Sequence, residues 1–397
     1  MPTFRSMSTA LAAELAPCAS APPRLNVVGA VGAPARPRRE RVVALDLFRG
    51  LMVAVMVIVN FEGSGQHVLP GLAHAPWNGL TFADVVFPGF LVAMGAAMAL
   101  GTRERRWGRV VRRSAALFGL GFGLNIFPNF DLAHVHTMGV LQRIAVCYLL
   151  ASVVLRGLSS VRARVTFCVL ALVAYWAVLA AGWPLHLGIA ATPHDGGVVG
   201  AVDRAVLGAR HVYAHGPVDP EGVLSTLPAL VSVLIGALVA PWLSRAPTRR
   251  TARLLITRGI ALTALGGAWA VILPVNKRLW TSSYTVVTGG IALVVLGLFV
   301  ALVARRPFPG PSRFRARRLV ATVGGNALLM FLAAEEVADT LTRYHVGRDT
   351  VRNWAWSHLF ASWAGFMAGS VLYASCLLAL LVVLAVNLEN RQIYVRL

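Results

Sequence analysis

Apolar residues in this chain fall into long blocks separated by short polar, arginine-rich segments. A helix that crosses the hydrocarbon core of a bilayer needs about twenty consecutive apolar residues, and the blocks have this length. The pattern therefore predicts about ten membrane-spanning helices. They are expected near residues 43–61, 82–100, 113–128, 138–155, 164–182, 223–243, 254–273, 282–303, 319–341 and 360–387.

The composition supports an all-α polytopic membrane protein. Hydrophobic residues make up 57% of the chain and charged residues only 13%, more apolar surface than a soluble protein of this length could bury. A β-barrel would instead show short segments of alternating hydrophobicity. We expect one transmembrane domain over residues 42–390. Residues 1–41 are rich in Ala, Pro and Arg without a sustained apolar run, which predicts a disordered cytoplasmic tail rather than a signal peptide.

The basic residues predict the orientation of these helices. Of the 37 Lys and Arg residues, 28 lie in the N-terminal tail, the C-terminus and alternate connecting segments, and 8 lie in the opposite loops. The positive-inside rule then places both termini in the cytoplasm. The same distribution explains the net charge of +21 by orientation and contact with anionic lipid, so no nucleic-acid partner is expected. The 4 cysteines show no spacing typical of a metal site or a disulfide.

The segment 72–90 carries the strongest candidate chemistry. His74 is the only titratable side chain between His67 and Asp84, and Asp84 begins the second predicted span. An imidazole can accept and return a proton near neutral pH, and a carboxylate can orient it. An ordinary solvated histidine is the alternative. Trp77 and Asn78 in the same loop are candidates for binding, although a tryptophan at this depth is typical of a membrane interface.

The first predicted span carries polar groups at both ends. Asp46 and Arg49 are three residues apart, so they share a helix face and can pair. Asn60 lies at the other end, about 21 Å away at 1.5 Å per residue. Ionisable groups within a span are costly and are therefore candidates for function. A structural ion pair and a helix cap explain the same residues equally well.

Further polar residues near the spans are candidates for substrate or cofactor binding. Arg143 at the outer end of the fourth span either binds an anionic or sugar group or extends toward the interface. Asp219 and Glu221 precede the sixth span, where the helix dipole alone also explains acidic residues. The remaining candidates are Gln142, Asn276, Lys277, Trp280, Asn326 and Glu335.

Six stretches carry a resemblance to a known family. They are LDLFRGLMVAVMVIVN, HAPWNGLTFADVVFPGFL, GVLQRIAVCYLL, DPEGVLSTLPAL, PVNKRLWTSSY and GGNALLMFL. In this order, over residues 42–390, the chain resembles the heparan-α-glucosaminide N-acetyltransferase family. The resemblance implies an acetyl-CoA-dependent enzyme without a metal, which acetylates a saccharide across the membrane. It selects His74, before the Trp-Asn-Gly-Leu-Thr stretch, and Asn60 as catalytic residues.

Two functions therefore follow from the sequence. The first is an N- or O-acetyltransferase of the inner (plasma) membrane that takes acetyl groups from cytosolic acetyl-CoA to an amino sugar or cell-envelope saccharide outside. His74 would deprotonate the acceptor, and Asn60 would hold the thioester carbonyl or the acceptor. Phosphate groups of CoA suit Arg49 and the basic segment 103–113. The alternative is a transporter or flippase of a polar solute. A homodimer is left open.

Overall fold

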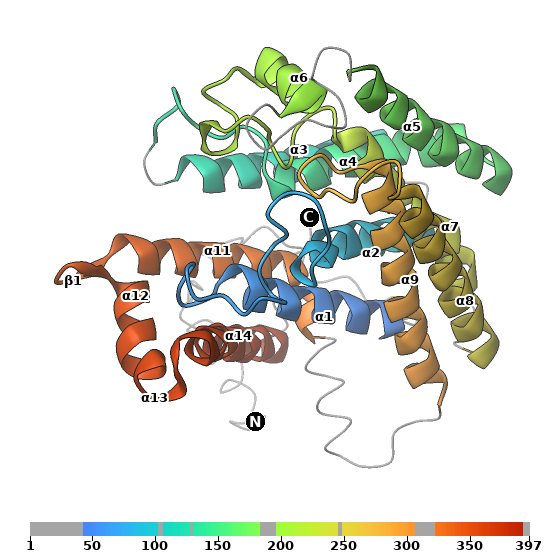
Figure 1. Ribbon diagram of the computed structural model, residues 1–397. Coiled ribbons are helices and arrows are strands. Elements are labelled where there is room, and N and C mark those ends of the chain that lie inside the picture. The colour runs from blue at the N-terminus through green and yellow to red at the C-terminus, as the bar shows by residue number, and fades with distance from the viewer. Residues whose placement is uncertain are drawn as a thin grey trace, which may run out of the picture. The chain divides into compact units, whose positions relative to one another are not determined.

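The computed structural model describes residues 43–101, 106–127, 130–182, 196–244, 248–305 and 322–391. The predicted tail, residues 1–41, lies outside the described residues. The described chain is mostly helical, and each of the predicted spans overlaps a helix. The last predicted span, 360–387, is interrupted at Gly365, directly before the helix Phe366–Asn390, and the ninth, 319–341, begins outside the described residues. Elements in chain order are α1 Val43–Asn60, η1 Ala83–Val85, α2 Val86–Leu100, α3 Trp107–Ile126, α4 Val140–Gly157, α5 Val161–Ala181, α6 Gly197–Leu207, η3 Tyr213–His215, α7 Thr226–Leu243, α8 Arg249–Trp269, α9 Ser282–Ala304, α11 Ala327–Arg343, β1 His345–Val346, β2 Asp349–Thr350, α12 Val351–Ala355, η4 Trp356–Ala361, α13 Ser362–Ala364 and α14 Phe366–Asn390 (Figure 1).

Seven candidate spans in the described residues are long and apolar enough to cross a membrane. They are α1, η1 with α2, α4, α5, α7, α9 and α14. On α5 the side chains of Val165, Val169 and Val173, four residues apart, are all exposed, as a lipid-facing stripe requires. The chain is thus a multi-pass helical membrane protein. Helices α3, α8 and α11 coincide with predicted spans but carry more charge, since α3 and α8 begin in basic segments and α11 contains acidic residues.

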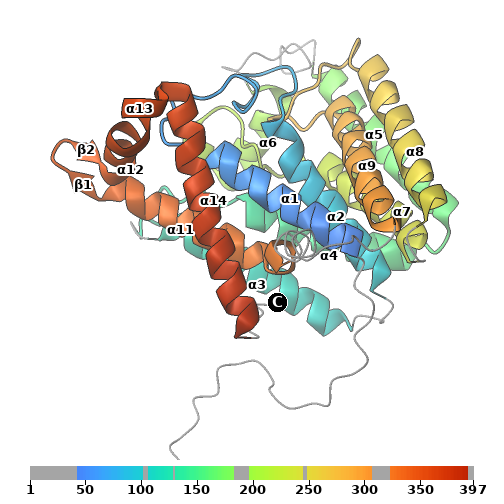
Figure 2. The same ribbon diagram turned by 90° about the horizontal axis from the view of Figure 1, so that it is seen from below.

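Helix α2 lies among α1, α4, α7 and α9 and packs most closely on α7 (Figures 1 and 2). A Cβ atom at Gly95 would lie 1.7 Å from the carbonyl oxygen of Val233, and one at Gly236 would lie 1.9 Å from that of Val92. Only glycine allows this approach of two backbones, a common basis of helix packing in membranes. This contact holds α2, which follows directly on η1 with its Asp84.

The C-terminal helices form a second set of contacts around α1. Figure 2 shows the long α14 beside α1 and α11, and both helices contact α1. Between α11 and α14 the chain forms a short antiparallel hairpin, β1–β2, followed by α12 and the π-helical segment η4. Arg352 of α12 donates a 2.9 Å hydrogen bond from Nε to the backbone oxygen of Glu62. The hairpin segment is therefore tied to the loop that follows α1.

Candidate active site

His74 and Asp84 form a close pair at the start of α2. Nδ1 of His74 lies 2.7 Å from Oδ1 of Asp84. The Asp84 side chain is 1% exposed, whereas that of His74 is 43% exposed. An ionised carboxylate only accepts hydrogen bonds, so the imidazole donates from Nδ1 and keeps its lone pair on Nε2. A half-exposed imidazole oriented in this way has the geometry of a general base.

The second oxygen of Asp84 is fixed by three donors. Oδ2 accepts hydrogen bonds from the backbone N–H of Thr81 at 3.0 Å, the hydroxyl of Thr81 at 3.0 Å and the backbone N–H of Ala75 at 3.2 Å. The hydroxyl of Tyr284, from α9, donates to the backbone oxygen of Asp84 at 2.6 Å. The carboxylate therefore has one orientation, and the histidine loop, residues 61–82 between α1 and η1, is folded around it.

Lys277 reaches the same pair from the loop between α8 and α9. Its Nζ lies 3.1 Å from Nδ1 and 3.3 Å from Nε2 of His74, and 3.6 Å from Oδ1 of Asp84. Burial lowers the pKa of Lys277, while the carboxylates of Asp84 and Glu221 oppose that shift. A cation beside the imidazole is a donor for negative charge that develops on a reacting oxygen. Lys277 lies in a loop predicted to face outside, where the positive-inside rule disfavours basic residues, and its contacts with His74 and Asp84 give it a local role.

Two asparagines join the histidine loop to the lysine loop, which is the segment 270–281 between α8 and α9. Nδ2 of Asn276 donates to Oδ1 of Asn78 at 3.0 Å, and the two residues form an isolated β-bridge. The N–H of Gly79 also donates to the oxygen of Val275 at 2.8 Å. Oδ1 of Asn276 accepts from the N–H of Leu279 at 2.9 Å. These bonds set the position of His74 relative to Lys277.

Trp280 ends the lysine loop and contacts Arg143 of α4. The guanidinium carbon of Arg143 lies 5.0 Å from the Trp280 ring centroid, and Nη2 of Arg143 donates to the oxygen of Gly222 at 2.8 Å and to the hydroxyl of Ser225. Arg143 is fully buried, and its Nε and Nη1 atoms have no partner in the described part of the chain. Trp280 has a φ of 50°, a left-handed conformation that is unusual for a bulky residue and typical of functional sites.

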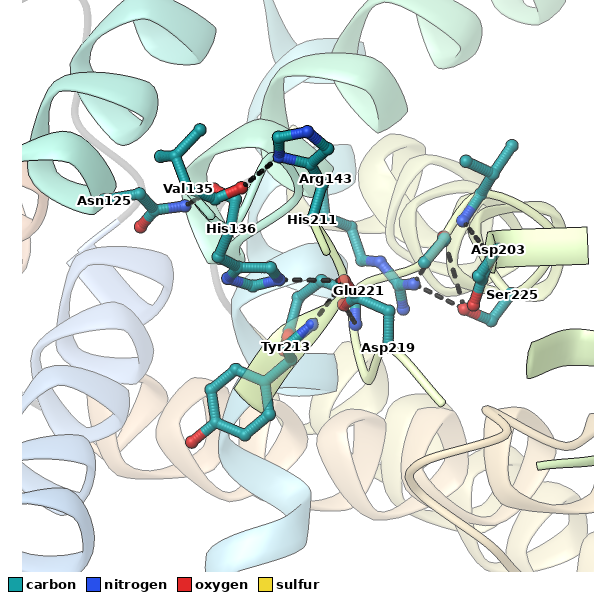
Figure 3. A network of polar contacts seen from close by, with 12 residues as sticks. Asn125, Val135, His136, Arg143, Asp203, His211, Tyr213, Asp219, Glu221 and Ser225 are labelled. Carbon is teal, nitrogen blue, oxygen red and sulfur yellow. Dashed lines mark hydrogen bonds and ion pairs between the residues drawn. The ribbon is translucent and has the colours of Figure 1, made fainter. Parts of the chain in front are cut away.

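A second histidine–aspartate pair lies near Arg143 (Figure 3). Nε2 of His136 lies 2.8 Å from Oδ2 of Asp219, which is fully buried. Oδ1 of Asp219 accepts a 2.9 Å hydrogen bond from the N–H of Glu221. Burial raises the pKa of Glu221, and it raises the pKa of Asp203 to about 6. His136 is not among the residues predicted from the sequence, because nothing in its local sequence indicates a partner 83 residues away.

Other predicted residues lie elsewhere in the fold. Asn60 ends α1 and is exposed, Gln142 is buried on α4, and Asn326 is buried at the start of α11 on which Glu335 lies. Arg49 is within electrostatic range of Asp46 and Arg113. Trp77 packs with Tyr175, Leu179 and Leu279. Within the described residues, Asn60, Arg49, Gln142, Asn326 and Glu335 form no hydrogen bond or ion pair with His74, Asp84 or Lys277.

The chain is similar in sequence to one family of known proteins. Residues 41–197 match the family model described as heparan-alpha-glucosaminide N-acetyltransferase, catalytic. Heparan-alpha-glucosaminide N-acetyltransferase of Mus musculus is 28% identical over 328 residues, which cover 66% of this chain and 49% of the relative. The Homo sapiens protein of that name is 29% identical over 323 residues, 64% of this chain and 48% of the relative. The chain thus spans about half the length of the curated relatives it matches.

Proposed function

Since the chain belongs to the heparan-α-glucosaminide N-acetyltransferase family, we propose that it transfers an acetyl group from cytosolic acetyl-CoA to a saccharide outside the membrane. The acceptor is an amino sugar or another cell-envelope saccharide, and the protein resides in the inner membrane. The observation that carries the proposal is the His74–Asp84 pair with Lys277 beside it. An imidazole oriented by a buried carboxylate can act as the general base of acyl transfer, and an adjacent cation can stabilise the oxyanion.

The proposed reaction is a direct transfer. Nε2 of His74 takes the proton of the acceptor amine or hydroxyl while that atom attacks the carbonyl carbon of the thioester. The negative charge moves to the carbonyl oxygen, where the ammonium of Lys277 stabilises it. The intermediate collapses, the carbon–sulfur bond breaks, and the CoA sulfur takes the proton from the imidazolium. The products are the acetylated acceptor and CoA, and Asp84 keeps the imidazole in one tautomer throughout.

Asn60 is proposed to bind the acceptor or the thioester carbonyl. It is the last residue of α1, and the chain runs from there through the His74 loop to the start of α2. Asn60 and His74 therefore belong to the same connection between two candidate spans. An exposed amide offers both a donor and an acceptor to a sugar hydroxyl. Asn60→Ala should raise the KM for the acceptor more than it lowers kcat.

The test uses the full chain in proteoliposomes loaded with acetyl-CoA, with glucosamine added as acceptor. Wild type should release CoA thiol and form N-acetylglucosamine. His74→Ala should lower the rate by about 10²–10⁴-fold, the usual contribution of a general base. His134→Ala is the matched control, because His134 forms an exposed pair with Asp131 at 2.8 Å. Unchanged transfer by His74→Ala would refute the base assignment. Solute uptake by wild type without CoA release would favour a transporter.

A further inference from the structure

The carboxyl group of Glu221 lies within electrostatic range of residues from both histidine–aspartate pairs. Glu221 stands in the loop before α7, and its side chain is partly buried. Within the described residues its backbone N–H bonds to Asp219, and its carboxyl group has no hydrogen bond or ion pair. The charged and titratable groups around it are Arg143 of α4, Asp219 of the same loop, Lys277 of the lysine loop, His136 before α4 and Tyr284 of α9. A carboxyl group without a fixed partner in such surroundings can exchange a proton.

Asp219 joins Glu221 to His136 (Figure 3). Its Oδ1 accepts from the N–H of Glu221 at 2.9 Å, and its Oδ2 lies 2.8 Å from Nε2 of His136. Because an ionised carboxylate only accepts hydrogen bonds, the imidazole of His136 donates from Nε2 and keeps its lone pair on Nδ1. The His136 side chain is 20% exposed, whereas that of Asp219 is fully buried. An imidazole that is fixed on one side and partly exposed can carry a proton from a buried group to water.

Buried polar atoms without a protein partner surround the backbone next to Glu221. Nη2 of Arg143 donates to the oxygen of Gly222, and a Cβ atom at Gly222 would lie 2.0 Å from Oδ2 of Asp203. Nε and Nη1 of Arg143, Oδ2 of Asp203 and Nε1 of Trp280 are buried and have no partner in the part of the chain that the structure describes. In proteins such atoms are usually hydrogen-bonded to water. This set contains both donors and acceptors, so waters bound to it can pass a proton along.

The proposed reaction leaves one proton to be removed when the acceptor is an amine. An amino group with an ordinary pKa of about 8 is mostly an ammonium ion, R–NH₃⁺, at neutral pH. Acetylation forms the N–C bond of the amide and breaks the C–S bond of the thioester. The ammonium ion and acetyl-CoA thus give R–NH–CO–CH₃, the CoA thiol and one H⁺. His74 moves a single proton from nitrogen to sulfur, so an acceptor that binds as ammonium needs a second group to take the other proton.

Given the proposed function, we infer that Glu221 takes this proton and that His136 passes it to the solvent. The carboxylate of Glu221 accepts the proton from the acceptor ammonium, and the free amine then attacks the thioester. The proton moves through water to Nδ1 of His136, which releases it on its exposed side, and Glu221 is ionised again. Asp219 is a positioning residue that holds both partners and stays ionised. Burial raises the pKa of Glu221 above its usual 4.5, which makes this carboxylate a stronger base toward an ammonium ion.

The experiment measures kcat/KM for N-acetylation of glucosamine at pH 7 and pH 9, with the full chain in proteoliposomes loaded with acetyl-CoA. In Glu221→Gln only the free amine can react. With an amine pKa of about 8, roughly a tenth of the acceptor is free amine at pH 7 and roughly nine-tenths at pH 9. Glu221→Gln should therefore be about 10-fold below wild type at pH 7 and within about twofold of it at pH 9. Glu221→Asp keeps a carboxyl group and should retain the wild-type ratio between the two pH values. Glu336→Gln on α11 is the matched control, because Glu336 is also partly buried and is not among the groups around Glu221.

The outcomes separate the proton route from the proposed function. Transfer by Glu221→Gln with the wild-type ratio between pH 7 and pH 9, or with an equal loss at both, refutes the route and leaves the function standing. A wild-type kcat/KM that follows the fraction of free amine refutes the route without any variant. His136→Gln keeps a donor to Asp219 but loses the lone pair, and it should show the deficit of Glu221→Gln at pH 7; a wild-type rate would exclude His136 as the outlet. Absence of N-acetylglucosamine formation by wild type at both pH values refutes the proposed function itself.

Discussion

Replacing Asp84 by asparagine should invert the tautomer of His74 without disturbing the fold. Oδ2 of Asp84 faces three donors, two from Thr81 and one from Ala75. An amide at this position must direct its oxygen toward those donors, because its NH₂ group cannot accept. The NH₂ group then faces Nδ1 of His74, 2.7 Å from the present Oδ1. Nδ1 becomes the acceptor, the proton moves to Nε2, and the base loses its lone pair.

The size of the effect follows from this geometry. Loss of the general base lowers kcat by about 10²–10⁴-fold, which is about 2.7–5.4 kcal/mol in the activation free energy. The three donors to the other oxygen keep their acceptor, so the melting temperature should change little. Asp84→Ala should be different. It leaves the Thr81 and Ala75 donors without their acceptor. Each buried polar group that loses its partner lowers the free energy of unfolding by about 1–3 kcal/mol.

The assay compares kcat for acetyl transfer in proteoliposomes with the melting temperature in detergent. Asp131→Asn is the control, because Asp131 pairs with His134 at 2.8 Å on an exposed loop. It should change neither quantity. If Asp84→Asn retains more than a tenth of the wild-type kcat, the carboxylate does not set the tautomer and the pair is structural. If Asp84→Asn melts as low as Asp84→Ala, the orientation deduced for the amide is wrong.

Three further outcomes are expected. Gly236→Ala should lower the melting temperature by several degrees, since its Cβ would lie 1.9 Å from a backbone oxygen of α2. Gly267→Ala is the control, because its Cβ would have nothing within 4 Å. Equal melting temperatures of the two variants would refute the close packing of α2 on α7. Burial raises the pKa of Glu62 from 4.5 to about 7, so the folded state keeps a proton that the unfolded state has lost. The melting temperature of wild type should therefore fall as the pH rises between these values, whereas that of Glu62→Gln should not. The same pH dependence of the melting temperature in both proteins would contradict this. Lys277→Met should lower kcat by about 10²-fold. Arg278→Met is the control, because Arg278 is the next residue and is exposed, and it should leave kcat unchanged. Equal kcat values for the two variants would exclude the role of Lys277 in stabilising the oxyanion.

The multi-pass helical class could be predicted from the chain alone. A bilayer offers no partner for backbone N–H and C=O groups, so a spanning segment must satisfy them within its own helix, and its length is set by the membrane. Both requirements are local and therefore appear in the sequence. Helices α1, α7 and α9 coincide closely with predicted spans for this reason. The ten spans, their orientation and the cytoplasmic termini stay predictions.

The His74 loop could also be predicted from the sequence, because His74 and Asp84 are only ten residues apart and Asp84 stands at the start of an apolar span. The resemblance selected the same histidine. Asp84 was expected to orient it, and a 2.7 Å contact joins the two side chains. The catalytic roles of both residues remain proposals.

The rest of the site was decided by tertiary structure. Lys277 reaches His74 across 203 residues, Asn276 reaches Asn78 across 198, and His136 reaches Asp219 across 83. The pattern of apolar residues predicts that these polar residues lie near the ends of helices. It does not predict which helix ends lie together. That is decided by the packing of helices, such as the contact of two backbones at Gly95, which depends on complementary surfaces far apart in the chain. The sequence thus determined which groups the protein possesses, and the packing of α2, α7 and α9 decided which of them meet.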